Sequence, residues 1–223
     1  MDVKEIIRRY RVDANDMVEP YFVADIVLMD WINDAIDEAC VRGRLIFDAH
    51  SPNVCHIAVT SGLALYPLHQ SVYEVCKAWF DPADGQSGRM LTQVSPFTLD
   101  KTYYENWRDM RGMPQYFIQT DTTVQLVPQP DVDGTVKMDV YRLPILPLVT
   151  DDGIPEIHRA HHVHLIQWLL YKGFSIPDSE FFDPQRAELA KQNFEDYFGI
   201  RPDSDLQRIV NQDRPHGVEP FWP

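Results

Sequence analysis

The stretch that decides the fold is residues 154–199, which read IPEIHRAHHVHLIQWLLYKGFSIPDSEFFDPQRAELAKQNFEDYFG. It contains two periodic apolar runs separated by a short polar break. Pro155 suits the first position of a helix, where a missing N–H costs nothing, and Glu156 complements the positive end of the helix. The first run is therefore predicted to be a helix that begins near Pro155.

The apolar residues of this first run recur at helical spacing. One stripe consists of Ala160, Val163, Ile166, Leu170 and Phe174. On an adjacent stripe, His158 and His162 are followed by Leu165 and Leu169. Beyond Val163 the run is apolar almost all the way round. This pattern is typical of a helix at the centre of a domain.

The second run has its own start and stop signals. Asp183 is placed to cap a helix whose first residue is Pro184, and Gly199 is placed to end it. Its apolar face consists of Ala187, Ala190, Phe194 and Phe198. Two capped helices joined by a short turn predict a helical hairpin, which we take as the scaffold of the protein.

Working outward from the hairpin, the N-terminal part of the chain also has helical periodicity. Helices are expected at residues 3–10 and 24–42, the second ending at Gly43. Together with the hairpin they predict a helical bundle. The expected core scaffold is Trp31, Ile32, Leu165, Ile166, Trp168, Phe194 and Phe198.

Between these helices the spacing of the apolar residues changes from that of helices to that of strands. Strands are predicted at 55–60, 71–79, 89–94, 116–119, 122–127 and 135–143, with a short helix at 99–107. In the last strand Val136, Met138 and Val140 alternate with polar residues, which predicts one buried face.

The expected fold class is therefore α+β: a helical bundle formed by N-terminal and C-terminal helices, with an inserted antiparallel β-rich module and an extended C-terminal arm. The expected boundaries are 1–51 for the N-terminal helices and 52–150 for the inserted module. The hairpin is expected at 151–200 and the arm at 201–223.

Composition limits the classes of function. The chain has 223 residues, with 34 acidic and 20 basic side chains and a net charge of -14. This balance argues against binding to a phosphate backbone, which depends on Lys and Arg. Three cysteines without CxxC spacing indicate reduced thiols. No signal peptide and no membrane-spanning run are expected.

The first candidate site is the histidine group. On a helix, His158 and His162 would stand at i and i+4, a spacing that can place two imidazoles on one zinc ion. However, no Glu follows His158 within the motif, and no third ligand with convincing spacing is found. A structural role is favoured, with His161 and His164 at a surface or interface. A small metal-dependent hydrolase using His158 and His162 is kept as an alternative.

The second candidate is the set of carboxylates on the first long helix, Asp30, Asp34, Asp37 and Glu38. Paired carboxylates can perform acid–base chemistry. These lie mainly opposite the apolar face, so a solvated face is favoured. We expect no catalytic residues, no metal site and no cofactor.

An ordered series of short motifs carries a resemblance to a known family. The series includes WINDA at 31–35, YPLH at 66–69, GMP at 112–114, LVPQPD at 126–131, YRLP at 141–144 and LIQW at 165–168. In this series, which extends over most of the chain, the protein resembles head-to-tail adaptors, or neck and head-completion proteins, of tailed bacteriophages.

The resemblance implies a structural virion protein of the neck, made in the host cytoplasm, without enzymatic activity. Its implied partners are the portal protein, a tail or nozzle protein, and further copies of itself in a homo-oligomeric ring, expected to be a dodecamer. Genome DNA would pass through the ring without specific binding, and no membrane is involved. A tail-tube or baseplate component is a further alternative.

The C-terminal segment is interpreted as a docking arm. Pro215 and Pro220 disfavour a helix, and an extended chain cannot bury large aromatic side chains by itself. Such residues anchor interfaces. The expected residues that dock on the portal or a neighbouring subunit are Phe221, Trp222, Ile209 and Val210. The alternative is that this segment folds back into a groove of its own domain.

Overall fold

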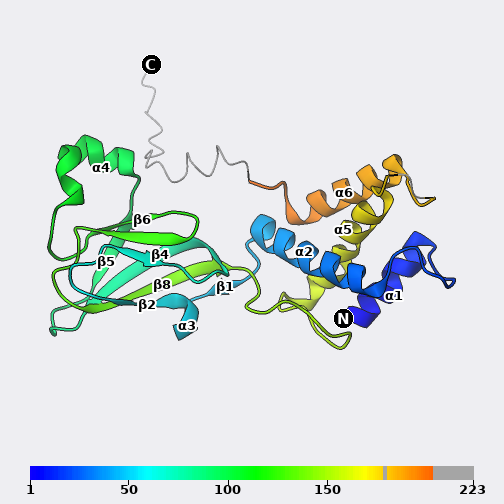
Figure 1. The fold of residues 1–223 in the computed structure, drawn as a ribbon, viewed down its shortest axis with the longest axis horizontal. Helices are drawn as coiled ribbons and strands as arrows, with labels where there is room; N and C mark the ends of the chain where they lie inside the picture. The colour runs from blue at the N-terminus through cyan, green and yellow to red at the C-terminus, as the bar shows by residue number, and fades with distance from the viewer. Residues whose placement is uncertain (178–179, 203–223) are drawn as a thin grey trace, which may run out of the picture. The chain divides into compact units, whose positions relative to one another are not determined.

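The computed structural model describes residues 1–177 and 180–202, which form two compact units (Figure 1). The first, called here the helical unit, consists of Met1–Phe47 and Tyr141–Arg201. The second, the sheet unit, contains Asp48–Val140. The chain thus enters the sheet unit after Phe47 and returns to the helical unit at Tyr141. The expected α+β class is confirmed.

The helical unit joins segments from the two ends of the described chain around one apolar core. Its helices are α1 (Val3–Ala14), α2 (Asp25–Gly43), the 3₁₀ turn η2 (Arg159–His161), α5 (His162–Phe174) and α6 (Pro184–Phe198). Ile32, Leu165, Ile166, Phe194 and Phe198 lie in the core, whereas Trp31 and Trp168 are partly buried and pack against it.

Helix α6 follows the local signals of its sequence. The side chain of Asp183 accepts hydrogen bonds from the backbone N–H groups of Gln185 and Arg186, which the first turn of a helix cannot satisfy internally. Pro184 occupies the first turn, and Gly199 follows the last one with φ 95°. At this φ glycine is favoured, although its ψ of 166° is not that of a left-handed helical cap.

Helix α5 begins later than its sequence suggests. The predicted start near Pro155 is wrong, because regular α-helix starts at His162. His158 instead caps the short η2 turn by accepting from the backbone N–H of Ala160 at 3.3 Å. The physical reason is tertiary: Ile157 is buried in the core, and its carbonyl oxygen contacts the ring of His162 at 3.0 Å.

The sheet unit is built mainly from strands. Its elements are α3 (Pro52–Cys55), β2 (His56–Val59), β3 (Leu65–Pro67), β4 (Val72–Pro82), β5 (Arg89–Gln93), α4 (Pro96–Tyr103), η1 (Tyr104–Arg108), β6 (Tyr116–Gln119), β7 (Thr123–Val127) and β8 (Gly134–Arg142). With β1 (Phe47–Asp48), the strand order is β1-β8-β4-β5-β6-β7-β3, and β2 also pairs with β8.

The sheet is mixed: the expected antiparallel pairing is found for β2–β8, β3–β7, β4–β5 and β6–β7, but not for β5–β6. Strands β5 and β6 run parallel, with Thr92 opposite Tyr116 and Gln93 opposite Phe117. A parallel pair needs a crossover connection. Here α4 and η1 supply it (Figure 1). The period of each strand says nothing about the direction of its neighbour, which is why the sequence did not reveal this pair.

Alternation along β8 matches the prediction. Val136, Met138 and Val140 are almost fully buried in the main core of the sheet unit. A second, smaller core lies under the crossover, where Leu99 and Trp107 are buried. The crossover is therefore a packed element of the sheet unit rather than a loose connection.

Candidate functional site

The histidine group does not form the arrangement that a shared metal ion would need. His158 precedes the helix and His162 begins it, so the two do not stand one turn apart on a helical face. Within residues 1–177 and 180–202, no group of three or more His, Cys, Asp or Glu side chains is arranged to hold a metal ion.

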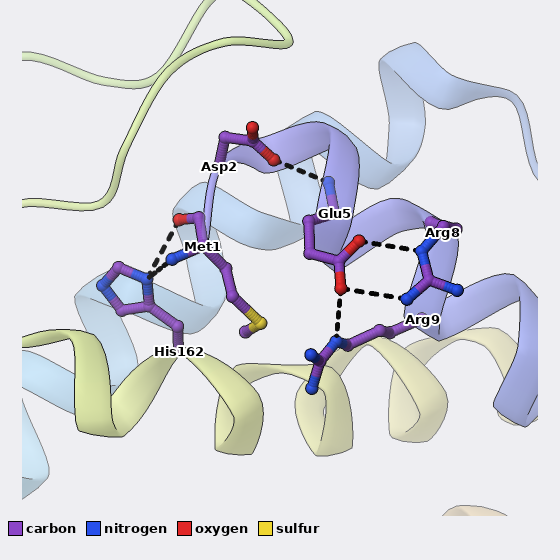
Figure 2. A network of polar contacts seen from close by, with 6 residues as sticks. All are labelled: Met1, Asp2, Glu5, Arg8, Arg9 and His162. Carbon is purple, nitrogen blue, oxygen red and sulfur yellow. Dashed lines mark hydrogen bonds and ion pairs between the residues drawn. The ribbon is translucent and has the colours of Figure 1, made fainter.

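His162 is a structural residue with an exposed fraction of only 1%. Its Nε2 atom lies 3.0 Å from the carbonyl oxygen of Ile157. Its Nδ1 atom lies 3.0 Å from both the amino nitrogen and the carbonyl oxygen of Met1. Figure 2 marks both contacts. Both ring nitrogens are thus engaged within the protein, and a metal ion at either would displace a hydrogen-bond partner.

The start of α1 is held by a second set of polar contacts beside His162 (Figure 2). Asp2 caps the helix by accepting from the N–H of Glu5 at 2.8 Å. The carboxylate of Glu5 forms ion pairs with Arg8 and Arg9, each at 2.8 Å. The hydrogen bonds from these two arginines lower the pKa of Glu5 to about 2. This network orders the helix start.

The other histidines join an aromatic cluster between α5 and α6. The ring of His164 stacks on Tyr197 with centroids 3.4 Å apart. Nδ1 of His161 lies 3.2 Å from the Tyr197 hydroxyl. Burial lowers the pKa of His161, which neighbouring histidines lower further, and burial also lowers the pKa of His164. These contacts fasten the helical hairpin.

Two of the four candidate carboxylates of α2, Asp34 and Glu38, form ion pairs. Asp34 lies 3.4 Å from Lys172, and Glu38 pairs with Arg42 and Arg201 at 3.1 and 2.9 Å. Burial, with help from Asp34 and Glu38, raises the pKa of Asp37. The ion pairs favour a structural role for this face over acid–base chemistry.

The loop between α1 and α2 is built around a buried arginine that sequence reasoning missed. Arg11 is 6% exposed and donates to Asp16 at 2.7 Å and to the carbonyl oxygen of Val23 at 3.0 Å. It also forms an ion pair with Asp25, and its guanidinium lies 3.6 Å from the ring centroid of Tyr21. An unpaired buried arginine would be very costly, so these partners hold the loop in one conformation.

This ordered loop displays apolar side chains to solvent. Met17, Val18 and Phe22, called here the loop patch, are 59%, 79% and 54% exposed. Phe22 is supported from behind by the ring of Phe181, with centroids 4.9 Å apart. Exposed apolar groups held by a buried polar network are typical of a binding surface rather than of a catalytic site.

A second exposed apolar group lies on the crossover of the sheet unit. Phe97 on α4 and Met90 on β5 are 59% and 58% exposed. The ammonium group of Lys101 lies 4.4 Å from the ring centroid of Phe97. Phe97 and Lys101, called here the crossover patch, combine apolar area with positive charge.

Met90 lies on the face of the sheet that packs against α4. Thr92 is opposite Tyr116 in the parallel pair, so Met90, two residues earlier, points to the same side as Tyr116. Tyr116 in turn contacts Tyr103 at the end of α4, with ring centroids 6.4 Å apart. Met90 is therefore on the α4 side of the sheet.

The predicted docking residues Ile209, Val210, Phe221 and Trp222 lie outside the described residues. Across residues 1–177 and 180–202, no helix has both the length and the apolar character needed to cross a bilayer.

Comparison with known proteins adds one finding. A family model described as SU10 adaptor protein matches residues 1–217. No curated protein matches the sequence.

Proposed function

The chain belongs to the SU10 adaptor protein family, and from this premise we propose that it is the head-to-tail adaptor in the neck of a tailed-bacteriophage virion. The family is one of phage structural adaptor proteins rather than of enzymes. In the proposed role, many copies form a ring beneath the portal, a dodecamer in the virion, and connect the capsid to the tail or nozzle protein. The observation that carries the proposal is the family match over residues 1–217.

The charge of the chain supports the proposed path of DNA through the ring. A net charge of -14 gives a channel wall that repels phosphates and lets the genome slide without specific binding. The exposed loop and crossover patches supply the apolar contact area that an assembly protein needs. The segment with Phe221 and Trp222 is proposed to dock on the portal or on a neighbouring subunit, with Ile209 and Val210 adding apolar area.

The alternatives have weaker support. A hydrolase using His158 and His162 is not favoured, because His162 already contacts Met1 and Ile157 through both ring nitrogens. A tail-tube or baseplate component would also oligomerise, and its position in the particle distinguishes it from a neck adaptor.

A phage that lacks this chain tests the proposal. We expect DNA-filled heads without attached tails, and restoration of complete particles when the wild-type chain is supplied from a plasmid. A reconstruction of the restored particles should place the chain between portal and tail. Density for the chain along the tail tube or in the baseplate, with a neck made of other proteins, would refute the proposal.

A further inference from the structure

The segment that carries the loop patch has no positive charge of its own, and an exposed cation beside it is Arg186 of α6, which donates to the carbonyl oxygen of Asp13 at 2.9 Å. Residues 12–30 contain no Lys, Arg or His, whereas Asp13, Glu19, Asp25 and Asp30 are exposed around the apolar side chains. Arg11, around which the loop is built, is buried and already bound to Asp16 and Asp25. A surface that fits the loop patch therefore needs exposed apolar side chains surrounded by basic groups.

The crossover patch of the same chain has that chemistry. In this acidic protein, the segment 89–111 carries Arg89, Lys101, Arg108 and Arg111 against three acidic residues. Arg108 is paired with Asp100 at 3.0 Å, while Lys101 lies over the exposed ring of Phe97. An aromatic side chain with an ammonium group above it can enter an apolar surface and place its charge against the acidic rim.

From this complementarity we propose that the loop patch of one copy binds the crossover patch of a second copy of the chain. Val18 and Met17 would pack on Phe97, and Lys101 would lie against Glu19. The contact is heterologous, because it joins two different surfaces. A bound pair keeps one free patch of each kind, so the contact can repeat from copy to copy and close into a ring. The inference rests on the proposed ring and assigns the surfaces that build it.

The test uses two substitutions that disable different patches of the full-length chain, Val18→Asp and Phe97→Asp. Both side chains are exposed, so neither change empties a core site. Matched controls place the same new charge elsewhere: Leu189→Asp on α6 and Leu63→Asp in the sheet unit, at side chains that are 58% and 54% exposed. Sedimentation velocity and native mass spectrometry over a range of concentrations report association.

We expect the wild type and both controls to associate alike, and each patch variant to need at least a tenfold higher concentration. Mixing the two patch variants should give one-to-one dimers and nothing larger, because only one intact pair of surfaces remains. The charge reversals Glu19→Lys and Lys101→Glu should each weaken association, and their combination in one chain should restore it.

A wild-type chain that stays monomeric at all concentrations would overturn the inference. So would patch variants that associate like wild type, or mixed variants that stay monomeric, since the loop patch would then have another occupant. These failures leave the proposed neck position untouched, because a particle reconstruction tests that position separately. Conversely, a confirmed contact in a chain found along the tail tube would refute the proposed function alone.

Discussion

A Cβ atom added to Gly173 would lie 2.5 Å from the hydroxyl oxygen of Tyr10. Tyr10 is on α1 and Gly173 is on α5, so this glycine sets how closely the two helices approach. The Tyr10 side chain is fully buried, and among the described residues its hydroxyl has no hydrogen-bond partner. Burial raises the pKa of this phenol well above its usual range.

Gly173→Ala should therefore destabilise the protein by about 1–3 kcal/mol despite the better helix propensity of alanine, because the added methyl group overpacks the core. Tyr10→Phe should cost little or nothing, since it removes a hydroxyl that is buried without a partner. In the double variant most of the loss should disappear. Urea unfolding of the wild type, the two single variants and the double variant gives the coupling free energy between the two positions. If the changes in unfolding free energy simply add, this account is contradicted.

Arg11→Met should destabilise the protein by about 3–5 kcal/mol, because it leaves the buried carboxylate of Asp16 without its partner. Arg8→Met on the same helix is the matched control. The Arg8 ion pair with Glu5 is exposed to solvent, so no measurable loss is expected. Thermal melts compare the two variants. Equal losses would show that the loop does not depend on the buried network.

Stability should fall as the pH drops from 7 towards 5. The pKa values of His161 and His164 lie below 6.5 in the folded protein. The unfolded chain therefore binds more protons as pH decreases through this range, and protonation favours it. The free energy of unfolding should differ less between pH 7 and pH 5 in the double variant His161→Gln, His164→Gln than in the wild type. Chemical unfolding of both proteins at the two pH values measures this. An unchanged slope would assign the effect to other groups.

The purified protein should not bind duplex DNA detectably at physiological salt. Its net charge of -14 opposes the counterion release that drives most non-specific binding. A gel-shift titration at about 150 mM salt measures this. Sub-micromolar binding would refute the idea of a wall that repels phosphates and would point to a basic surface instead.

Truncation after Asn211 should leave the melting temperature of the isolated protein almost unchanged and abolish its attachment to portal-bearing capsids. The removed segment contains Phe221 and Trp222, which are proposed to supply most of the binding energy of the arm. A full-length variant with Phe221→Ser and Trp222→Ser should show the same loss of attachment. A truncated chain that melts much lower yet joins capsids normally would instead make this segment part of the fold.

Local signals in the sequence were enough wherever a few neighbouring residues decide the structure. Asp183 and Pro184 start α6 by satisfying or removing N–H groups in its first turn, which is an interaction within the helix itself. The alternation of Val136, Met138 and Val140 likewise records one buried strand face. Such features depend on contacts within a few residues, so they can be recognised without the fold.

Only the tertiary structure decided where distant segments meet. Pro155 and Glu156 have the chemistry of a helix start, yet α5 begins at His162, whose ring contacts Ile157 and Met1. The burial of Arg11 depends on Asp16 and Asp25 closing around it from a loop and from another helix. Val18 and Phe97 are likewise exposed because the fold leaves their side chains uncovered. A hydrophobic pattern in the sequence cannot distinguish such exposed residues from residues of the core.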